Sequence, residues 1–222
     1  MKLTLSRAAL AAAAVAFVVI VLGAYVRLSH AGLGCPDWPG CYGELTWPAE
    51  SHEIERANQA FPERPVETAK AWKEMVHRYL AGILVLLVVF INYLAWKPGS
   101  GSRQSRAAAG FLLVLILFQA ALGMWTVTLK LKPLIVMAHL LGGLATFSLL
   151  LWLGWRSRPV PAGHDNLSYA PFRSAVLAGL LVLVVQLALG GWTSANYSAL
   201  ACPDFPTCQG QWWPDTNFRD GF

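Results

Sequence analysis

Charged residues are scarce in this sequence. Only 13% of its 222 residues are Asp, Glu, Lys or Arg, whereas 56% are hydrophobic. Because a water-soluble domain carries about 25% charged residues, this composition argues against a soluble globular protein. The net charge of +5 does not indicate a nucleic-acid partner either, since no basic face lies outside the apolar segments.

Cysteine is also scarce, with four residues in the whole chain. None of them belongs to a Cys-x-x-Cys-His motif, which excludes covalent attachment of a c-type haem. The cysteines form two pairs with the same spacing, Cys35 with Cys41 and Cys202 with Cys208.

The sequence contains several long hydrophobic runs. Five runs reach the roughly 17–25 residues that a helix needs to cross a bilayer. They are Ala8–Val26, Val76–Trp96, Ala107–Val127, Leu134–Trp155 and Ala175–Trp192. We therefore expect an all-α polytopic membrane protein. The first run follows Lys2 and Arg7 as a signal peptide would, but it is longer than a typical signal core.

The basic residues predict the orientation in the membrane. If the N-terminus is cytoplasmic, the inner segments hold eight bases and a single acid, Asp165; the bases are Lys2, Arg7, Lys97, Arg103, Arg106, Arg156, Arg158 and Arg173. The long segment 27–75 then lies outside with seven glutamates among its charges, and Lys130 and Lys132 are discordant. The positive-inside rule favours this topology, which puts both cysteine pairs on the outer side.

The cysteine pairs lie in an internal repeat. The segment Val21–Gly43 parallels Ala188–Gly210 without a gap, and "GCPDWPGCYG" returns as "ACPDFPTCQG". We interpret the repeat as a duplicated membrane unit. The expected organisation is a four-helix transmembrane bundle in residues 1–158, a cytoplasmic linker in 159–174, and the first helix and outer loop of a second bundle in 175–222. On this interpretation the sequence is a C-terminally truncated form.

The spacing of the cysteines leaves their chemistry open. Each pair could form a structural disulfide, which an oxidising outer compartment permits. A redox-active disulfide is a second possibility. Four thiolates could also hold zinc, provided that the two loops meet.

Two histidines lie close to the outer ends of apolar runs. His77 is in "EMVHRYLAG" and His139 is in "VMAHLLGG", each followed by small residues. At 1.5 Å of rise per residue the two imidazoles would lie at similar depth, as the axial ligands of a haem iron require. Each could instead be a hydrogen-bonded interfacial residue. His30 is a weaker candidate ligand.

Glu74 and Arg78 flank the first of these histidines. Glu74 lies one turn before His77, so the two share a helix face. It is either a solvated acid at a helix start or a carboxylate that accepts a proton or stabilises positive charge beside the iron. Arg78 could pair with a haem propionate or anchor at the lipid headgroups.

With these segments the chain resembles the haem A synthase family. The resemblance rests on "LGAYVRLSHAGLGCPDWPGCYG", "EMVHRYLAG", "FQAALGMWTVTLKLKPLIVMAHLLGG" and "ANYSALACPDFPTCQGQWWP", in that order. It implies oxidation of the C8 methyl group of haem O to the formyl group of haem A. It also implies that His77 and His139 are iron ligands, that Glu74 is catalytic and that Cys35 and Cys41 are the family's outer cysteine pair.

The resemblance carries further expectations. The family has eight helices in two halves, and its second histidine pair, for a haem b cofactor, would lie beyond residue 222. We therefore expect the chain alone to be inactive unless another polypeptide completes it. Expected partners are haem O, the haem O synthase, oxidase assembly factors and membrane lipid, in the bacterial plasma membrane or the mitochondrial inner membrane. The alternatives are an electron-transferring cytochrome b and a membrane thiol oxidoreductase.

Overall fold

The computed structural model of the chain is mainly helical in the residues that it describes, which are 2–98, 102–158, 170–198 and 200–215. No β-strand occurs in these residues. The helices are α1 (Lys2–Leu28), α2 (Ser51–Ala60), α3 (Thr68–Trp96), α4 (Arg103–Thr128), α5 (Pro133–Arg156), the short 3₁₀ helix η1 (Ala170–Phe172) and α6 (Arg173–Ala195). All but α2 and η1 are long and apolar enough to cross a membrane. The expected all-α polytopic membrane fold is confirmed.

Helix α3 begins earlier than the hydrophobic run predicts. It starts at Thr68 and not near Val76, so its first two turns are polar and carry Lys70, Lys73 and Glu74. Hydrophobicity alone therefore did not reveal them. The short helix α2 was not expected either; Glu50 and Glu53 form a capping box at its start, which satisfies backbone N–H groups there.

Local sequence signals account for several helix ends. Helix α5 begins with Pro133, whose missing N–H costs nothing in the first turn of a helix. The Ser102 side chain caps α4 by accepting a hydrogen bond from the Ser105 N–H at 3.1 Å. After α1, His30 takes a φ of 51°, which stops the helix.

The chain separates into two compact units. One comprises Met1–Leu131 and Gly142–Pro159, and the other comprises Lys132–Leu141 and Val160–Phe222. Of the predicted cytoplasmic linker 159–174, residues 159–169 lie outside the described residues. The remaining five form η1 and the start of α6.

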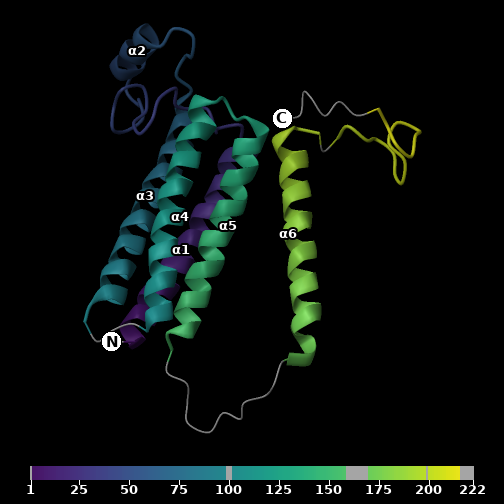
Figure 1. The fold of residues 1–222 in the computed structure, drawn as a ribbon. Helices are drawn as coiled ribbons and strands as arrows, with labels where there is room; N and C mark the ends of the chain where they lie inside the picture. The colour runs from purple at the N-terminus through teal and green to yellow at the C-terminus, as the bar shows by residue number, and fades with distance from the viewer. Residues whose placement is uncertain (1, 99–101, 159–169, 199, 216–222) are drawn as a thin grey trace. The chain divides into compact units, whose positions relative to one another are not determined.

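Small residues on α1 allow the helices of the first unit to pack closely (Figure 1). Four alanines at helical spacing form a buried stripe on α1: Ala9, Ala12, Ala13 and Ala16. They share one core with apolar side chains of α3, α4 and the second half of α5. Ser6 donates a hydrogen bond of 2.7 Å to the Gly154 carbonyl, joining α1 to α5. Close backbone approach through small residues is the usual way in which membrane helices associate.

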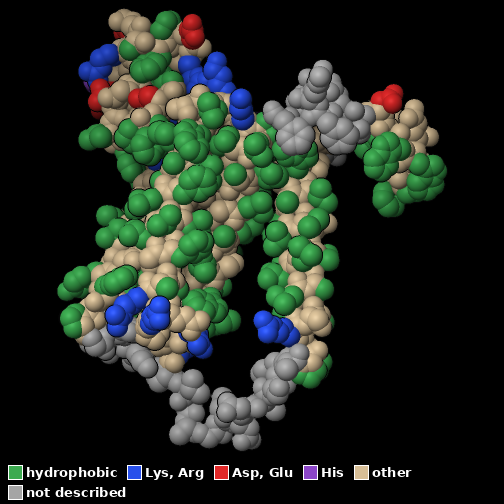
Figure 2. All heavy atoms as spheres, viewed as in Figure 1, with side chains coloured by type: hydrophobic (Ala, Val, Ile, Leu, Met, Phe, Trp, Pro, Cys, Tyr) green, Lys and Arg blue, Asp and Glu red, His purple; other side chains and the backbone are tan. Residues whose placement is uncertain are grey.

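A second buried cluster lies where α3 meets the segment between α1 and α3. Its members are Cys35, Cys41, Tyr42, Ala57, Ala71 and Met75. Figure 2 shows that the acidic side chains of this unit gather around α2, whereas the flanks of the long helices are covered by hydrophobic side chains. The polar cap and the apolar helices are thus distinct parts of one unit.

Candidate functional site

The candidate site is centred on the second and third turns of α3. Glu74, His77 and Arg78 all lie there, well inside the helix that starts at Thr68. Glu74 is only 4% exposed. The interpretation of Glu74 as a solvated acid at a helix start is therefore wrong, because the preceding loop folds back over it.

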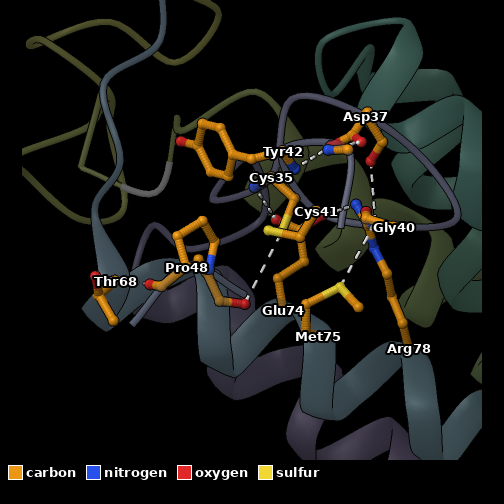
Figure 3. Close-up of a disulfide and its surroundings, with 12 residues drawn as sticks. Cys35, Asp37, Gly40, Cys41, Tyr42, Pro48, Thr68, Glu74, Met75 and Arg78 are labelled. Atoms are coloured by element: carbon orange, nitrogen blue, oxygen red, sulfur yellow. Dashed lines mark hydrogen bonds and ion pairs between the residues drawn. A yellow bond between two sulfur atoms is a disulfide. The ribbon is translucent and has the colours of Figure 1, made fainter. Parts of the chain in front are cut away.

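The carboxylate of Glu74 is held from two sides (Figure 3). One oxygen accepts a hydrogen bond of 3.0 Å from the Cys35 N–H. The other pairs with Arg78 Nη2 at 2.5 Å. Because the acid and the arginine are four residues apart, they sit one above the other on a single helix face.

Arg78 also binds the backbone of the cysteine loop. Its Nη1 donates to the carbonyl oxygens of Asp37 at 3.0 Å, Pro39 at 3.3 Å and Gly40 at 2.5 Å. A planar guanidinium with five N–H donors suits such a fan of acceptors. In this structure Arg78 thus holds the loop against α3.

Both cysteine pairs are disulfides, Cys35–Cys41 and Cys202–Cys208. The predicted disulfide bonds are therefore confirmed. No free cysteine remains in the described residues, so a zinc site made of four thiolates is not formed. Cys35 and Cys41 are both 0% exposed, which shields the first disulfide from thiols in solution.

An aspartate that sequence analysis did not single out closes the first loop. Asp37 accepts hydrogen bonds from the N–H groups of Tyr42 at 2.6 Å and Gly43 at 2.8 Å. Asp204 does the same for Gln209 at 2.7 Å and Gly210 at 3.0 Å. The signal was present in the sequence, because this aspartate is one of the identities between the two repeats.

A glycine lets the loop approach α3. A Cβ atom placed on Gly34 would lie 2.7 Å from the backbone carbon of Lys70 and 2.9 Å from the nitrogen of Ala71. No side chain fits at those distances from backbone atoms. Gly34 is therefore needed for the contact that carries the Cys35 N–H to Glu74.

His77 lies on α3 against the outer half of α1. A Cβ atom on Gly23 would be 2.9 Å from Cε1 of the imidazole. The backbone of Val19 lies close to the imidazole. Its Nδ1 is buried and has no hydrogen-bond partner among the described residues. This nitrogen is therefore available as a ligand.

His139 is six residues into α5 and partly buried. It belongs to the second compact unit, and only its position on α5 is considered. Gly142 and Gly143 follow it by three and four residues, on the same face of α5. Gly142 faces the Gln119 side chain of α4, and a Cβ atom on Gly143 would meet both Gln119 and Ile20.

The other histidines have different surroundings. His30 is exposed just after α1, and His52 pairs with Glu50 at 3.4 Å on the surface of α2. His164 lies outside the described residues. Within the described part of the chain, no group of three or more His, Cys, Asp and Glu side chains forms a metal cluster.

Comparison with known proteins places these residues in a family. Residues 6–221 match the COX15-CtaA family, described as cytochrome oxidase assembly protein. A protein named heme A synthase from Shewanella oneidensis is 50% identical over 204 residues, which is 92% of this chain and 61% of that protein. Heme A synthases from Shouchella clausii and Halalkalibacterium halodurans are each 28% identical over 89% of this chain and 61% of their own length. The chain thus spans about three fifths of the length of these relatives.

Proposed function

Because the chain belongs to the cytochrome oxidase assembly protein family, we propose that it is the substrate-binding part of a haem A synthase. The reaction is oxidation of the C8 methyl group of haem O to the formyl group of haem A. The enzyme class, a membrane oxidoreductase, follows from the relatives named heme A synthase. A location in the bacterial plasma membrane, or the mitochondrial inner membrane, with a cytoplasmic N-terminus belongs to the same proposal.

In this proposal His77 and His139 ligate the iron of haem O. The observation that carries it is the buried Nδ1 of His77, which has no partner in the described residues. A buried imidazole nitrogen without a partner is costly, and coordination would remove that cost. The glycines that follow His139 do not carry this proposal, because the side chains of Gln119 and Ile20 occupy the space beside them.

Glu74 is the proposed catalytic group. It shares a helix face with His77, and its described hydrogen bonds come from Cys35 and Arg78. An ionised carboxylate has about four lone-pair positions, so Glu74 retains capacity to accept a substrate proton. The buried negative charge also stabilises positive charge that develops on the substrate.

Arg78 supports this site from the side of the loop. Its bonds to three loop carbonyls and to Glu74 keep the carboxylate one turn from His77. Pairing of its remaining donors with a haem propionate is part of the proposal. The disulfide Cys35–Cys41 then serves to shape the loop, and its burial argues against a thiol oxidoreductase that uses this pair.

By the resemblance, a second histidine pair holds a haem b cofactor, and the described residues offer no such pair. We therefore propose that the chain binds haem O but turns it over only with a polypeptide that provides the second haem site. The haem O synthase and oxidase assembly factors are the proposed functional partners.

The test is expression in bacterial membranes with haem O supplied. The purified chain should show the absorbance of a bis-histidine haem, and His77→Ala or His139→Ala should abolish it. His52→Ala, a change in an exposed histidine of α2, should leave the spectrum unchanged. If neither His77→Ala nor His139→Ala reduces bound haem, the ligand assignment is wrong.

Turnover is measured by mass identification of haem A. Co-expression with the part of the Shewanella oneidensis relative that this chain does not match should yield haem A, and the chain alone should not. Glu74→Gln should keep the hydrogen bond to Cys35 and the bound haem but lose product. Unchanged haem A formation in Glu74→Gln would show that Glu74 is not the catalytic group, whereas no haem A from the unaltered, co-expressed chain would support an electron-transferring cytochrome b.

A further inference from the structure

Lys73 is a cation on α3 that directly precedes Glu74 in the chain. It lies in the second turn of the helix, which starts at Thr68, and it is only partly exposed. Lys73 forms no ion pair with the residues that the structure describes. Because an ammonium group carries a full positive charge and three N–H donors, Lys73 is available to an anionic ligand.

The side chain of Lys73 is held against α1. Its Nζ lies 5.1 Å from the centroid of the Tyr25 ring, which is within the range of a cation–π interaction. Two residues earlier on α1, Gly23 meets the imidazole of His77. Lys73 and His77 therefore approach the same part of α1.

Lys73 lies one helical turn further out than His77. The two residues are four positions apart on α3, so they share a helix face. Side chains on a helix tilt toward its N-terminus, and the N-terminal end of α3 is the outer end in the predicted orientation. The ammonium group thus lies between the level of the imidazole and the outer surface.

Arg78 is a second cation near His77, and most of its donors already have partners. Its Nη1 donates to three carbonyl oxygens of the Cys35–Cys41 loop, and its Nη2 pairs with Glu74. Haem O carries two propionates, which are anionic at neutral pH. Arg78 has few donors left for them, so Lys73 is better placed to bind one of the two.

We propose that Lys73 binds a propionate of haem O and thereby determines which edge of the macrocycle faces Glu74. This inference rests on the proposed function. The C8 methyl group and one propionate occupy neighbouring carbons of the same pyrrole ring, and Lys73 and Glu74 are neighbours on α3. A propionate held by Lys73 brings the C8 methyl group to the side of the site where Glu74 lies. The methyl groups at C1 and C3, which have no neighbouring propionate, are turned away.

The surroundings of Lys73 favour this contact. A hydrogen bond between an ammonium group and a carboxylate is charge-assisted and stronger than a neutral one. The contact with Tyr25 limits the conformations of the lysine side chain, so less entropy is lost on binding. Lys73 is in this sense a positioning residue, because it acts on the C8 methyl group through the propionate.

The experiment compares haem O with its dimethyl ester, in which both propionates are uncharged. The purified chain in phosphatidylcholine nanodiscs is titrated with each haem, and binding is followed by absorbance. Lys73→Met should weaken the binding of haem O roughly tenfold, as expected for the loss of one charge-assisted hydrogen bond. Binding of the ester should not change. Lys73→Arg keeps the charge and should retain the affinity for haem O.

Lys70→Met is the matched control. Lys70 lies on the same helix and already pairs with Glu67 at 2.7 Å, so its replacement should leave both affinities unchanged. The ester also tests the unaltered chain, which should bind it more weakly than haem O. Equal binding of the two haems by the unaltered chain would overturn the proposal even if Lys73→Met did not fold.

Two results with the variant would also overturn the proposal. An equal loss of affinity for haem O and for the ester would show that Lys73 supports the fold and not the propionate. An unchanged affinity for haem O, together with less phosphatidylglycerol retained from bacterial membranes, would make a lipid phosphate the partner of Lys73. If the unaltered chain bound neither haem, the proposed function would fall, and this inference with it.

Discussion

Glu74 and Arg78 form a nearly buried ion pair, and each side chain also hydrogen-bonds the backbone of the Cys35–Cys41 loop. The two side chains are 5% and 11% exposed. Removing one partner of a buried pair costs about 3–5 kcal/mol, because the other charge is left without compensation. Here the arginine also satisfies three loop carbonyls, so the pair determines where the loop sits on α3. Glu74 thereby gains a fixed position one turn from His77.

Gly23 determines how the imidazole of His77 lies against α1. Gly23→Ala places a methyl group 2.9 Å from Cε1, and the overpacking should cost about 1–3 kcal/mol. We expect weaker haem binding in an absorbance titration, by roughly tenfold for each 1.4 kcal/mol. Gly110→Ala on α4, where an added Cβ meets nothing within 4 Å, is the control and should bind haem normally. Equal affinities of the two variants would contradict the packing of His77 on Gly23.

Asp204 makes the closure of the Cys202–Cys208 loop sensitive to acid. Hydrogen bonds from the Thr207 hydroxyl and from the N–H groups of Gly210 and Gln209 hold the pKa of Asp204 below its ordinary value. A carboxyl with a lowered pKa in the folded state stabilises the loop above its ordinary pKa, and this contribution is lost as the pH falls through the lowered value.

We therefore expect the amide hydrogens of Gln209 and Gly210 to stay protected from exchange down to the ordinary aspartate pKa of 3.8 and to lose protection below it. Hydrogen exchange measured by NMR, corrected for intrinsic rates, gives the protection at each pH. Asp204→Asn should remove the pH dependence. Loss of protection already near neutral pH in the unaltered chain would show that Asp204 does not close the loop.

At the scale of helices, small residues decide which elements can meet. The alanine stripe of α1 packs into the bundle core, and Gly154 of α5 meets α1 at Leu10. Lipid surrounds such helices with apolar groups whether or not they associate, so association depends on close packing and hydrogen bonds. A larger side chain at Gly154 should therefore weaken the packing of α1 on α5.

Gly154→Val should loosen the contact between α1 and α5. A Cβ atom at this position lies 2.7 Å from Leu10 Cδ2 and 3.4 Å from the Leu10 backbone nitrogen, so the Leu10 side chain or the helix must shift. We expect a loss of about 1–3 kcal/mol in the free energy of unfolding, measured by denaturation in lipid-detergent micelles. Gly110→Val introduces the same side chain on α4 in open surroundings and should cost much less. A similar loss in both variants would point to helix propensity as the cause.

At the scale of the whole molecule, five apolar helices make the chain a multi-pass membrane protein. Acidic and basic side chains both gather on the cap around α2 (Figure 2). Lys97, Arg103 and Arg106 lie at the ends of α3 and α4 that join these helices to each other. The positive-inside rule assigns that end to the cytoplasm.

Reporter fusions test this orientation. Alkaline phosphatase, which is active only outside the cytoplasm, should be active when fused after Ala60 and inactive when fused after Lys97. A fluorescent protein that folds only in the cytoplasm should give the opposite pattern at the same two positions. The reverse result at both positions would overturn the predicted orientation.

Much of the fold could be predicted from local features of the sequence. The five membrane helices follow from the length of their hydrophobic runs, because a bilayer demands that backbone polar groups be satisfied within each helix. The short spacing made a disulfide within each loop one of the open possibilities, and the loop repeat can be read directly from the sequence. These features need only neighbouring residues, so one sequence suffices to see them.

The environment of Glu74 was decided by tertiary structure alone. Its partner Cys35 lies 39 residues earlier in the chain, and the carbonyls that bind Arg78 lie at a similar distance. The start of α3 at Thr68 depends on the same contacts, because its polar first turns are stabilised by the loop that folds over them. Composition and periodicity describe what a residue is and what lies beside it in the chain. Burial of a charge and the donors that make it tolerable depend on which distant segments meet, and only the folded chain determines that.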